Sequence, residues 1–477
     1  MEKFYITTAI AYVNAAPHIG FALELCQADA IARYHKIHGK EVYFLTGTDE
    51  HGTKIQQTAK LQGIEPQELA DKNSQLFRDI GAKLNISNDD FIRTSSERHK
   101  EGAVKIWNKL VEAGDLYEKE YEGLYCVGCE AFVLEKDLVN GECSIHKKAP
   151  ERLKEKNWFF KLSKYSEKIK ELILKDELLI RPTSRRNEFL SLLEEGLQDV
   201  SFSRPKKTLQ WGIDVPGDDS QVMYVWCDAL TNYISALGDK VDKFWPADVH
   251  LIGKDILRFH AGIWIGMLLS AKIEIPKSIL VHGFVTSEGQ KMSKSLGNVV
   301  DPFGLVDEWG VEPVRYYLLR EIPTADDGDF SRERFKVLYE DELANTIGNL
   351  LRRTVAMCVK YFDGKVPESD FAEISEFCEE AWADYHNAFA DFNIKVAIES
   401  ILSVARHANA YVEQNKPWEL AKTDQARLQI VIANLLKMCR QIGHMLEPII
   451  PTIAESILKQ AGKEKVELLE PLFPMRT

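Results

Sequence analysis

The first fifty residues alternate between runs that favour strands and one run that favours a helix. Residues 4–10 and 41–46 are short, apolar and rich in β-favouring side chains, whereas residues 21–38 have helical periodicity. This order predicts a βαβ unit, the building block of parallel sheets, whose ligands bind at the carboxyl ends of the strands. Strand-like runs at 248–253 and 278–283 indicate that the same sheet resumes later in the chain.

Residues 116–222 separate the two parts of the predicted sheet, which indicates an insertion. Within it, residues 147–186 have a Lys-rich, helical character and contain 13 Lys and Arg against 6 Asp and Glu, although the whole chain has a net charge of −13. That stretch fits either a solvated helix face or a local surface for a polyanion. The negative net charge of the whole chain excludes only non-specific, charge-driven binding along nucleic acid.

Strand signals vanish after residue 341. Two sets of apolar residues then recur at helical spacing: Ile394, Ile398, Ile401 and Ala405, followed by Leu428, Leu435, Cys439, Ile442 and Leu446. Pro417 and Pro448 stand where one helix ends and the next begins, because proline is tolerated in the first helical turn but not in the interior. The C-terminal part is therefore predicted to be a helical bundle.

The expected fold class is α/β, a Rossmann-like parallel-sheet catalytic domain with an insertion, followed by an all-α bundle. The predicted ranges are 1–115 and 223–340 for the two halves of the sheet domain, 116–222 for the insertion and 341–477 for the bundle. The sequence has neither a signal peptide nor an apolar stretch of the roughly 18 residues that span a membrane. Eight unevenly spaced cysteines indicate a reducing compartment, so we expect a cytoplasmic protein without a membrane segment.

Two short motifs have the chemistry of phosphate binding. His18 and Gly20 stand between the first strand and the helix, where free backbone N–H groups, a partial positive charge and a histidine donor meet an anion. Lys291 and Lys294 bracket small hydroxyl residues on a loop flanked by glycines, which suits a mobile clamp on a polyphosphate. Each motif alone also has an ordinary explanation, as a capping histidine or as exposed lysines.

Together the two motifs resemble the signatures of class I aminoacyl-tRNA synthetases: His18-Ile19-Gly20-Phe21 is similar to HIGH, and Lys291-Met292-Ser293-Lys294-Ser295 to KMSKS. The resemblance implies activation of an amino acid by ATP with Mg²⁺, in which the substrate carboxylate attacks the α-phosphate and the enzyme supplies position and charge. It implies catalytic roles for His18, Lys291 and Lys294, and ATP binding by these three with Gly20, Met292, Ser293 and Ser295. Phe21 replaces the usual second histidine and cannot donate a hydrogen bond.

Four further segments narrow the resemblance to methionyl-tRNA synthetases: AIAYVN at 9–14, TGTDEHG at 46–52, YVWCDA at 224–229 and IGKDI at 252–256. The insertion is also too short for the editing domain of related synthetases. The resemblance implies a methionine pocket formed by Ala9, Ile10, Tyr12, Asp49, Trp226, Ala229, Tyr233, Asp255, Ile256 and His260, with Asp49 holding the substrate ammonium. An apolar, aromatic-edged pocket suits a thioether, although from the residues alone these aromatics are equally ordinary core. Leu230 stands where the family commonly has proline.

A candidate metal site lies in the insertion. Cys126, Cys129, Cys143 and His146 have the spacing C-x₂-C…C-x₂-H, which can close a tetrahedral zinc site. Four protein ligands leave no open coordination position, so we expect one structural Zn²⁺ per chain. The metal would stabilise a segment that is too short to form a hydrophobic core of its own. A turn with free thiols is the alternative. The resemblance implies that the knuckle lies beside the acceptor end of tRNA.

The resemblance assigns anticodon reading to the helical part, at Asn349, Arg353 and Trp418. Aromatic stacking and edge hydrogen bonds read single-stranded bases, although Trp418 alone also fits a core residue at a helix start. The implied activity forms methionyl-adenylate and transfers methionine to the 3′ end of initiator and elongator tRNA(Met), and the enzyme is expected to be a monomer. The alternatives are another nucleotidyltransferase of the superfamily and a catalytically impaired tRNA-binding paralogue, which Phe21 suggests.

Overall fold

The computed structural model describes the chain except for Met1, Leu134 and residues 128–130, 136–137, 145–146, 292–297 and 475–477. Two compact units make up the chain. The sheet unit comprises Met1–Pro17, Gly39–Ala82 and Ser87–His282, and the helical unit comprises His18–His38, Lys83–Ile86 and Gly283–Thr477. In the part of the chain that the structure describes, no helix is both long and apolar enough to cross a bilayer.

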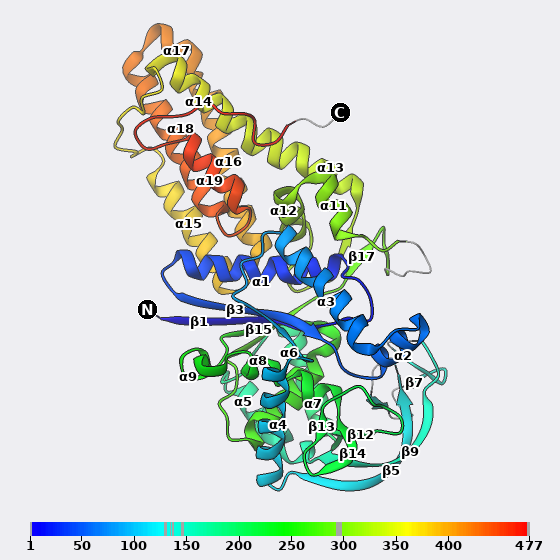
Figure 1. Cartoon of the computed structure of the whole chain (residues 1–477). Coiled ribbons are helices and arrows are strands. Elements are labelled where there is room, and N and C mark those ends of the chain that lie inside the picture. Colours follow the sequence, from blue (N-terminus) through cyan, green and yellow to red (C-terminus); the bar gives the residue numbers. More distant parts are fainter. Residues whose placement is uncertain are drawn as a thin grey trace. The chain divides into compact units, whose positions relative to one another are not determined.

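The sheet unit contains a seven-stranded parallel sheet, of which Figure 1 labels β1, β3 and β15. Its strands, in spatial order, are β10 (Leu179–Arg181), β16 (Ser278–His282), β15 (Val249–Gly253), β1 (Lys3–Thr8), β3 (Glu41–Asp49) and β2 (Ala11–Tyr12), and β4 (Asp90–Arg93) also pairs with β3. All of these pairs are parallel. The strands β15 and β16 are buried along their whole length, as parallel strands covered on both faces are. The predicted parallel α/β sheet is confirmed.

The rest of the sheet unit consists of antiparallel strands and short helices. One sheet has the order β11 (Val200–Ser201), β9 (Glu151–Phe160), β5 (Leu116–Cys126) and β6 (Ala131–Val133); a second has β12 (Ser203–Pro205), β14 (Asp218–Met223) and β13 (Asp214–Val215); β7 (Leu138–Val139) pairs with β8 (Glu142–Cys143). The α-helices are α2 (Thr53–Gln62), α3 (Pro66–Lys83), α4 (Glu97–Glu112), α5 (Ser166–Leu174), α6 (Thr183–Glu195), α7 (Val225–Ala229), α8 (Asn232–Ser235), α9 (Val241–Phe244) and α10 (Ile265–Ser270), which continues a π-helix at Phe259–Trp264. The sequence did not predict that β10, from within 116–222, joins the parallel sheet.

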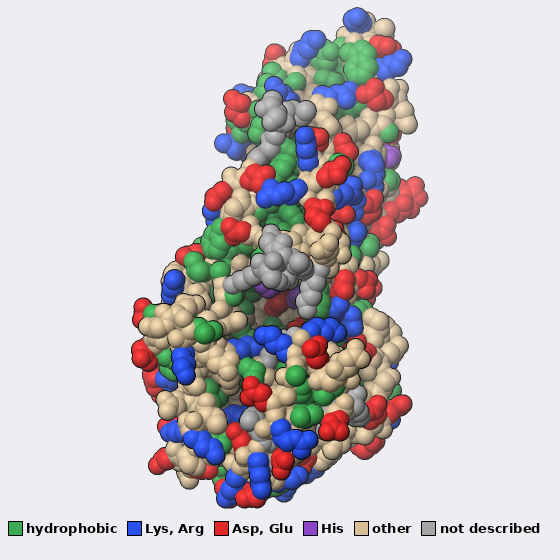
Figure 2. All heavy atoms as spheres, turned by 90° about the vertical axis from the view of Figure 1, so that its right-hand side faces the viewer, with side chains coloured by type: hydrophobic (Ala, Val, Ile, Leu, Met, Phe, Trp, Pro, Cys, Tyr) green, Lys and Arg blue, Asp and Glu red, His purple; other side chains and the backbone are tan. Residues whose placement is uncertain are grey.

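The helical interpretation of residues 147–186 was wrong in its first part, which is strand β9. Along β9 the buried Glu155, Asn157 and Phe159 alternate with exposed positions such as Lys156, which is the period of a strand. Lys and Glu are as common on the exposed face of a strand as on that of a helix, so the composition did not distinguish the two. Among the described residues, at least seven of the 13 basic side chains in the stretch form ion pairs within the unit. Figure 2 shows basic and acidic side chains interspersed on the visible face.

The helical unit confirms the predicted bundle. It contains α1 (Ile19–Ile37), α11 (Pro302–Trp309), α12 (Val311–Glu321), α13 (Arg332–Leu338), the π-helical turn Tyr339–Gly348, α14 (Asn349–Phe362), α15 (Ser375–Ala390), α16 (Ile394–Asn415), α17 (Pro417–Thr423), α18 (Gln425–Leu446) and α19 (Pro451–Gln460), with a small sheet of β18 (Gln290–Lys291), β17 (Val285–Ser287) and β19 (Gly328–Phe330). Helices α15, α16, α18 and α19 pack side by side (Figure 1). Pro417 occupies the first position of α17, and α18 ends before Pro448.

A buried arginine explains why α1 belongs to the helical unit although it follows β1 in sequence. The guanidinium of Arg315 in α12 is fully buried and lies 2.7 Å from the carboxylate of Asp29 in α1. The same guanidinium donates to the carbonyls of Ile449, at 2.9 Å, and Leu84, at 3.1 Å. A buried charge is tolerated only when it is paired and fully hydrogen-bonded, so this cluster fixes α1 against α12 and the turn after α18.

Candidate active site

His18 caps the N-terminus of α1. Its backbone is extended, and its Nδ1 accepts a hydrogen bond from the N–H of Gly20 at 3.0 Å. Because Nδ1 is an acceptor, the proton of the neutral ring lies on Nε2, which leaves a donor beside the free N–H groups of the helix. A Cβ on residue 20 would lie 2.8 Å from the His18 ring, so any other residue there would displace this ring. Phe21 is buried, at 7 % exposure.

The second phosphate motif is only partly described. The backbone of Lys291 lies in β18, opposite Thr286 of β17. The predicted ATP-binding residues Met292, Ser293, Lys294 and Ser295 lie outside the described residues, and their roles stay predictions.

A small cavity in the sheet unit brings together nine of the ten predicted methionine-pocket residues. It is lined by Ala9, Ile10, Tyr12, Asp49, Trp226, Ala229, Leu230, Asn232, Tyr233, Ile256 and His260. The cavity lies at the carboxyl ends of the parallel strands, because Ala9 follows β1, Asp49 ends β3 and Ile256 follows β15. The tenth predicted residue, Asp255, is exposed and does not line it. Asn232 was missed, since the resemblance does not assign it to the pocket.

One wall of the cavity is uncharged although it contains a histidine. The Nδ1–H of His260 donates to the carbonyl of Ile256 at 3.0 Å, and its Nε2 accepts the hydroxyl proton of Tyr233 at 2.7 Å. Burial lowers the pKa of His260 to about 4, so the ring is neutral at physiological pH. Trp226 stacks on Phe259 with ring centroids 4.0 Å apart. This wall offers aromatic surface and no charge to a ligand.

A buried hydrogen-bond network around Asp228, next to the cavity-lining Ala229, was not predicted. The carboxylate of Asp228 accepts from Nδ1 of His51 at 2.6 Å and from Nε2 of His99 at 2.7 Å. Burial by itself would raise the pKa of Asp228, but His51 and then His99 lower it to about 2. The network ties the loop after Asp49 to the helix that carries Trp226. His51 and Asp228 lie inside the recognised segments, whereas no sequence signal marks His99.

Comparison with known proteins decides the family. A family model described as "tRNA synthetases class I (M)" matches residues 4–136 and 133–355, and one described as "Anticodon binding domain of methionyl tRNA ligase" matches residues 363–471. The chain belongs to the methionyl-tRNA synthetase family.

Relatives of this family match the chain over nearly its whole length. Methionine–tRNA ligases of Rickettsia felis and Brucella suis are each 45% identical to it, over 98% and 96% of this chain and 94% and 91% of theirs. The solved structure of Mycobacterium tuberculosis methionyl-tRNA synthetase in complex with methionyl-adenylate has a TM-score of 0.95 and 38% identity, and covers both chains completely. These similarities do not favour another nucleotidyltransferase or an impaired paralogue.

The structure describes two of the four candidate zinc ligands of this synthetase. Cys126 ends β5 and Cys143 ends β8, and both thiols are buried at 3 % exposure, which fits ligands of a closed site. Cys129 and His146 lie outside the described residues. The described residues contain no cluster of three or more metal-binding side chains, and with two candidate ligands missing from that search the zinc site stays a prediction.

The three predicted anticodon residues lie on two helices of the helical unit. Asn349 and Arg353 stand one turn apart on α14, where such residues share a face. Arg353 pairs with Glu413 of α16 at 2.8 Å, and α16 ends three residues before Trp418. Trp418 is 40 % exposed, so its interpretation as a core residue is wrong.

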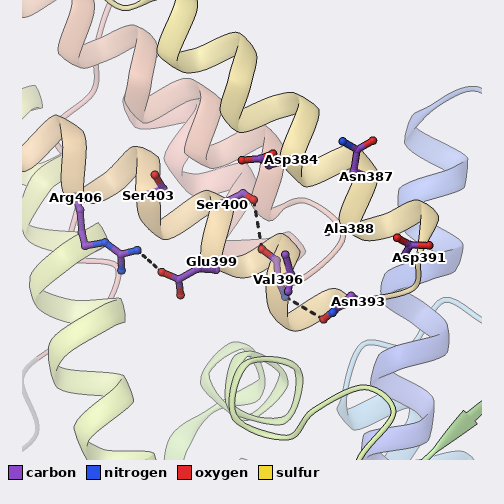
Figure 3. A pocket seen from close by; sticks show the side chains of 10 residues that line it. All are labelled: Asp384, Asn387, Ala388, Asp391, Asn393, Val396, Glu399, Ser400, Ser403 and Arg406. Carbon is purple, nitrogen blue, oxygen red and sulfur yellow. Dashed lines mark hydrogen bonds and ion pairs between the residues drawn. The ribbon is translucent and has the colours of Figure 1, made fainter. Parts of the chain in front are cut away.

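Another pocket lies in the helical unit, between α15 and α16 (Figure 3). Its lining includes the carboxylates of Asp384, Asp391 and Glu399, and Glu399 pairs with Arg406 and Arg320. An acidic surface repels RNA and nucleotide phosphates. We therefore assign it no part in the family's reaction.

Proposed function

We propose that the chain activates methionine with ATP, releasing pyrophosphate, and then transfers methionine from methionyl-adenylate to the 3′ end of initiator and elongator tRNA(Met). The observation that carries this assignment is the single cavity that gathers nine of the predicted residues from four separate segments. Its neutral histidine and stacked tryptophan suit a thioether, which has no charge and little hydrogen-bonding capacity. The buried carboxylate of Asp49, at 3 % exposure, holds the substrate ammonium.

ATP is held by residues that supply position and charge, because attack of the substrate carboxylate on the α-phosphate needs no enzyme nucleophile. The Nε2–H of His18 and the free N–H groups of α1 donate to phosphate oxygens. Lys291 and Lys294 neutralise charge that grows on the leaving pyrophosphate. Mg²⁺ bound to ATP supplies further charge neutralisation there.

The helical unit selects the tRNA. The exposed indole of Trp418 stacks on an anticodon base, while Asn349 and Arg353 hydrogen-bond base edges. Cys126, Cys129, Cys143 and His146 would hold one structural Zn²⁺, which would stabilise the knuckle beside the acceptor end. We further propose that the enzyme works as a monomer in the cytoplasm.

Pyrophosphate exchange into ATP, screened over the twenty amino acids, tests the proposal. Methionine alone should support exchange, and the charged product should form only with tRNA(Met). Exchange with another amino acid would refute the specificity, and no exchange with any amino acid would leave the impaired paralogue as the better description.

A further inference from the structure

Two residues that line the cavity, Asn232 and Trp226, each have a polar side-chain atom without a partner among the described residues. Asn232 begins α8, lines the cavity and is 1 % exposed. Its Nδ2 donates to the carbonyl of Ala229 at 2.7 Å. This bond fixes the orientation of the amide, because a carbonyl cannot accept from Oδ1. Among the described residues, no group donates a hydrogen bond to Asn232 Oδ1.

The neighbouring side chains do not supply the missing donor. The hydroxyl proton of Tyr233 is directed to His260, and the ring proton of His260 is directed to the carbonyl of Ile256. The carboxylate of Asp49 has no proton to donate. The indole N–H of Trp226 is a donor without a partner among the described residues, yet it does not bond Asn232. A buried acceptor is rarely left unsatisfied, so a ligand in the cavity is the natural partner.

The chemistry of methionine selects which group that is. Its thioether and its carboxylate only accept hydrogen bonds, whereas its α-ammonium only donates them. We propose that Oδ1 of Asn232 accepts one N–H of the substrate α-ammonium, beside the carboxylate of Asp49. This rests on the proposed function. This pair of acceptors matches the charge of the ammonium. One carboxylate balances its single positive charge, and the neutral amide adds a second acceptor without adding charge.

Two variants and two ligand analogues test the contact. Asn232→Leu keeps the size and branching but removes the acceptor, while Asn232→Asp keeps an acceptor. Methioninol retains the ammonium and lacks the carboxylate; 4-(methylthio)butanoate retains the carboxylate and lacks the ammonium. For Asn232→Leu we expect the KM for methionine in pyrophosphate exchange and the inhibition constant of methioninol each to rise about tenfold or more, as for a lost bond to a charged group. The inhibition constant of 4-(methylthio)butanoate should stay within about twofold, and Asn232→Asp should recover most of the methioninol affinity.

A matched control is available in Asn157 of β9, which is also 1 % exposed and also has an Oδ1 without a partner among the described residues. Asn157→Leu should lower the thermal midpoint without changing the KM for methionine. Equal weakening of both analogues by Asn232→Leu would overturn the inference, because a bound water or a structural role gives that result. An unchanged KM in a folded Asn232→Leu variant would overturn it as well. Absence of methionine-dependent exchange in the unsubstituted protein would instead refute the proposed function.

Discussion

The two candidate recognition regions of this synthetase lie in opposite solvent environments. The candidate methionine pocket is buried, uncharged along its Tyr233–His260 wall, and built from four segments that only the fold brings together. The candidate anticodon surface is exposed and depends on Trp418, with Asn349 and Arg353 one helical turn apart. Burial strengthens each polar contact and makes each unpaired group costly, whereas exposed stacking is weaker and tolerant. Substitutions in the pocket should therefore have larger effects than substitutions on the anticodon surface.

Asp49→Asn should give the largest effect. It removes a buried charge and leaves the substrate ammonium without a counter-charge, so the KM for methionine in pyrophosphate exchange should rise about 100-fold. The exposed Asp255, which does not line the cavity, is the matched control, and Asp255→Asn should change that KM by less than about threefold. Comparable effects of the two substitutions would break the distinction between buried and exposed sites.

Asp228→Asn should have the next largest effect. The carboxylate oxygens of Asp228 lie 2.6 and 2.7 Å from ring nitrogens of His51 and His99. In the amide, one of these oxygens is replaced by an NH₂ group, which faces a histidine N–H and cannot accept from it. We expect kcat/KM for methionine activation to fall about 30-fold and the thermal midpoint to drop, because a buried donor loses its acceptor. Saturating methionine should not restore kcat fully if the network positions both walls of the pocket; full restoration would show that it acts on affinity alone.

Trp418→Ala should act on only one of the two reactions. Loss of a stacking platform should lower kcat/KM for tRNA aminoacylation about tenfold and leave methionine activation unchanged. Glu419→Ala, at the exposed neighbouring position, is the control and should affect neither reaction. Equal loss of both activities in Trp418→Ala would contradict a purely tRNA-reading role.

The last expected effect is on stability rather than on activity, and it concerns pH. The pKa of His260 is about 4 in the folded protein and about 6.5 when exposed, so the unfolded chain binds more protons between these values. The stability contribution of the neutral ring is therefore complete above pH 6.5 and is lost as the pH falls toward 4. Between pH 7 and pH 5, urea unfolding should show a loss of about 2 kcal/mol from this group. His260→Gln should remove that part of the pH dependence, and an identical pH dependence in the variant would contradict the assignment.

The sequence predicted the elements that local pattern controls. Apolar runs located the parallel strands β1, β3, β15 and β16, and helical spacing located the bundle. The pocket residues were found because their segments resemble those of a family, not because any local property marks Ala229 or Ile256. Strand β9 was misread because Lys and Glu suit either exposed surface.

Other features depend on contacts between distant segments. The assignment of α1 to the helical unit follows from the Asp29–Arg315 pair, which links residues 286 positions apart. Asp228, His51 and His99 form a network only after folding, and the unused acceptor of Asn232 is visible only when every neighbouring donor is known. These are tertiary properties, and residue type alone does not encode them.

The uncharged wall of Tyr233 and His260 has a consequence for translational fidelity. A pocket that recognises a side chain by volume and aromatic contact discriminates poorly against an isostere, because a difference of one methylene-sized group changes binding by only about 1–3 kcal/mol. Norleucine, in which a methylene replaces sulfur, and selenomethionine both match that shape. Accuracy at methionine codons would then depend on the ratio of these amino acids in the cell as much as on the enzyme, and the same tolerance would allow selenium or hydrocarbon labels to enter proteins through this synthetase.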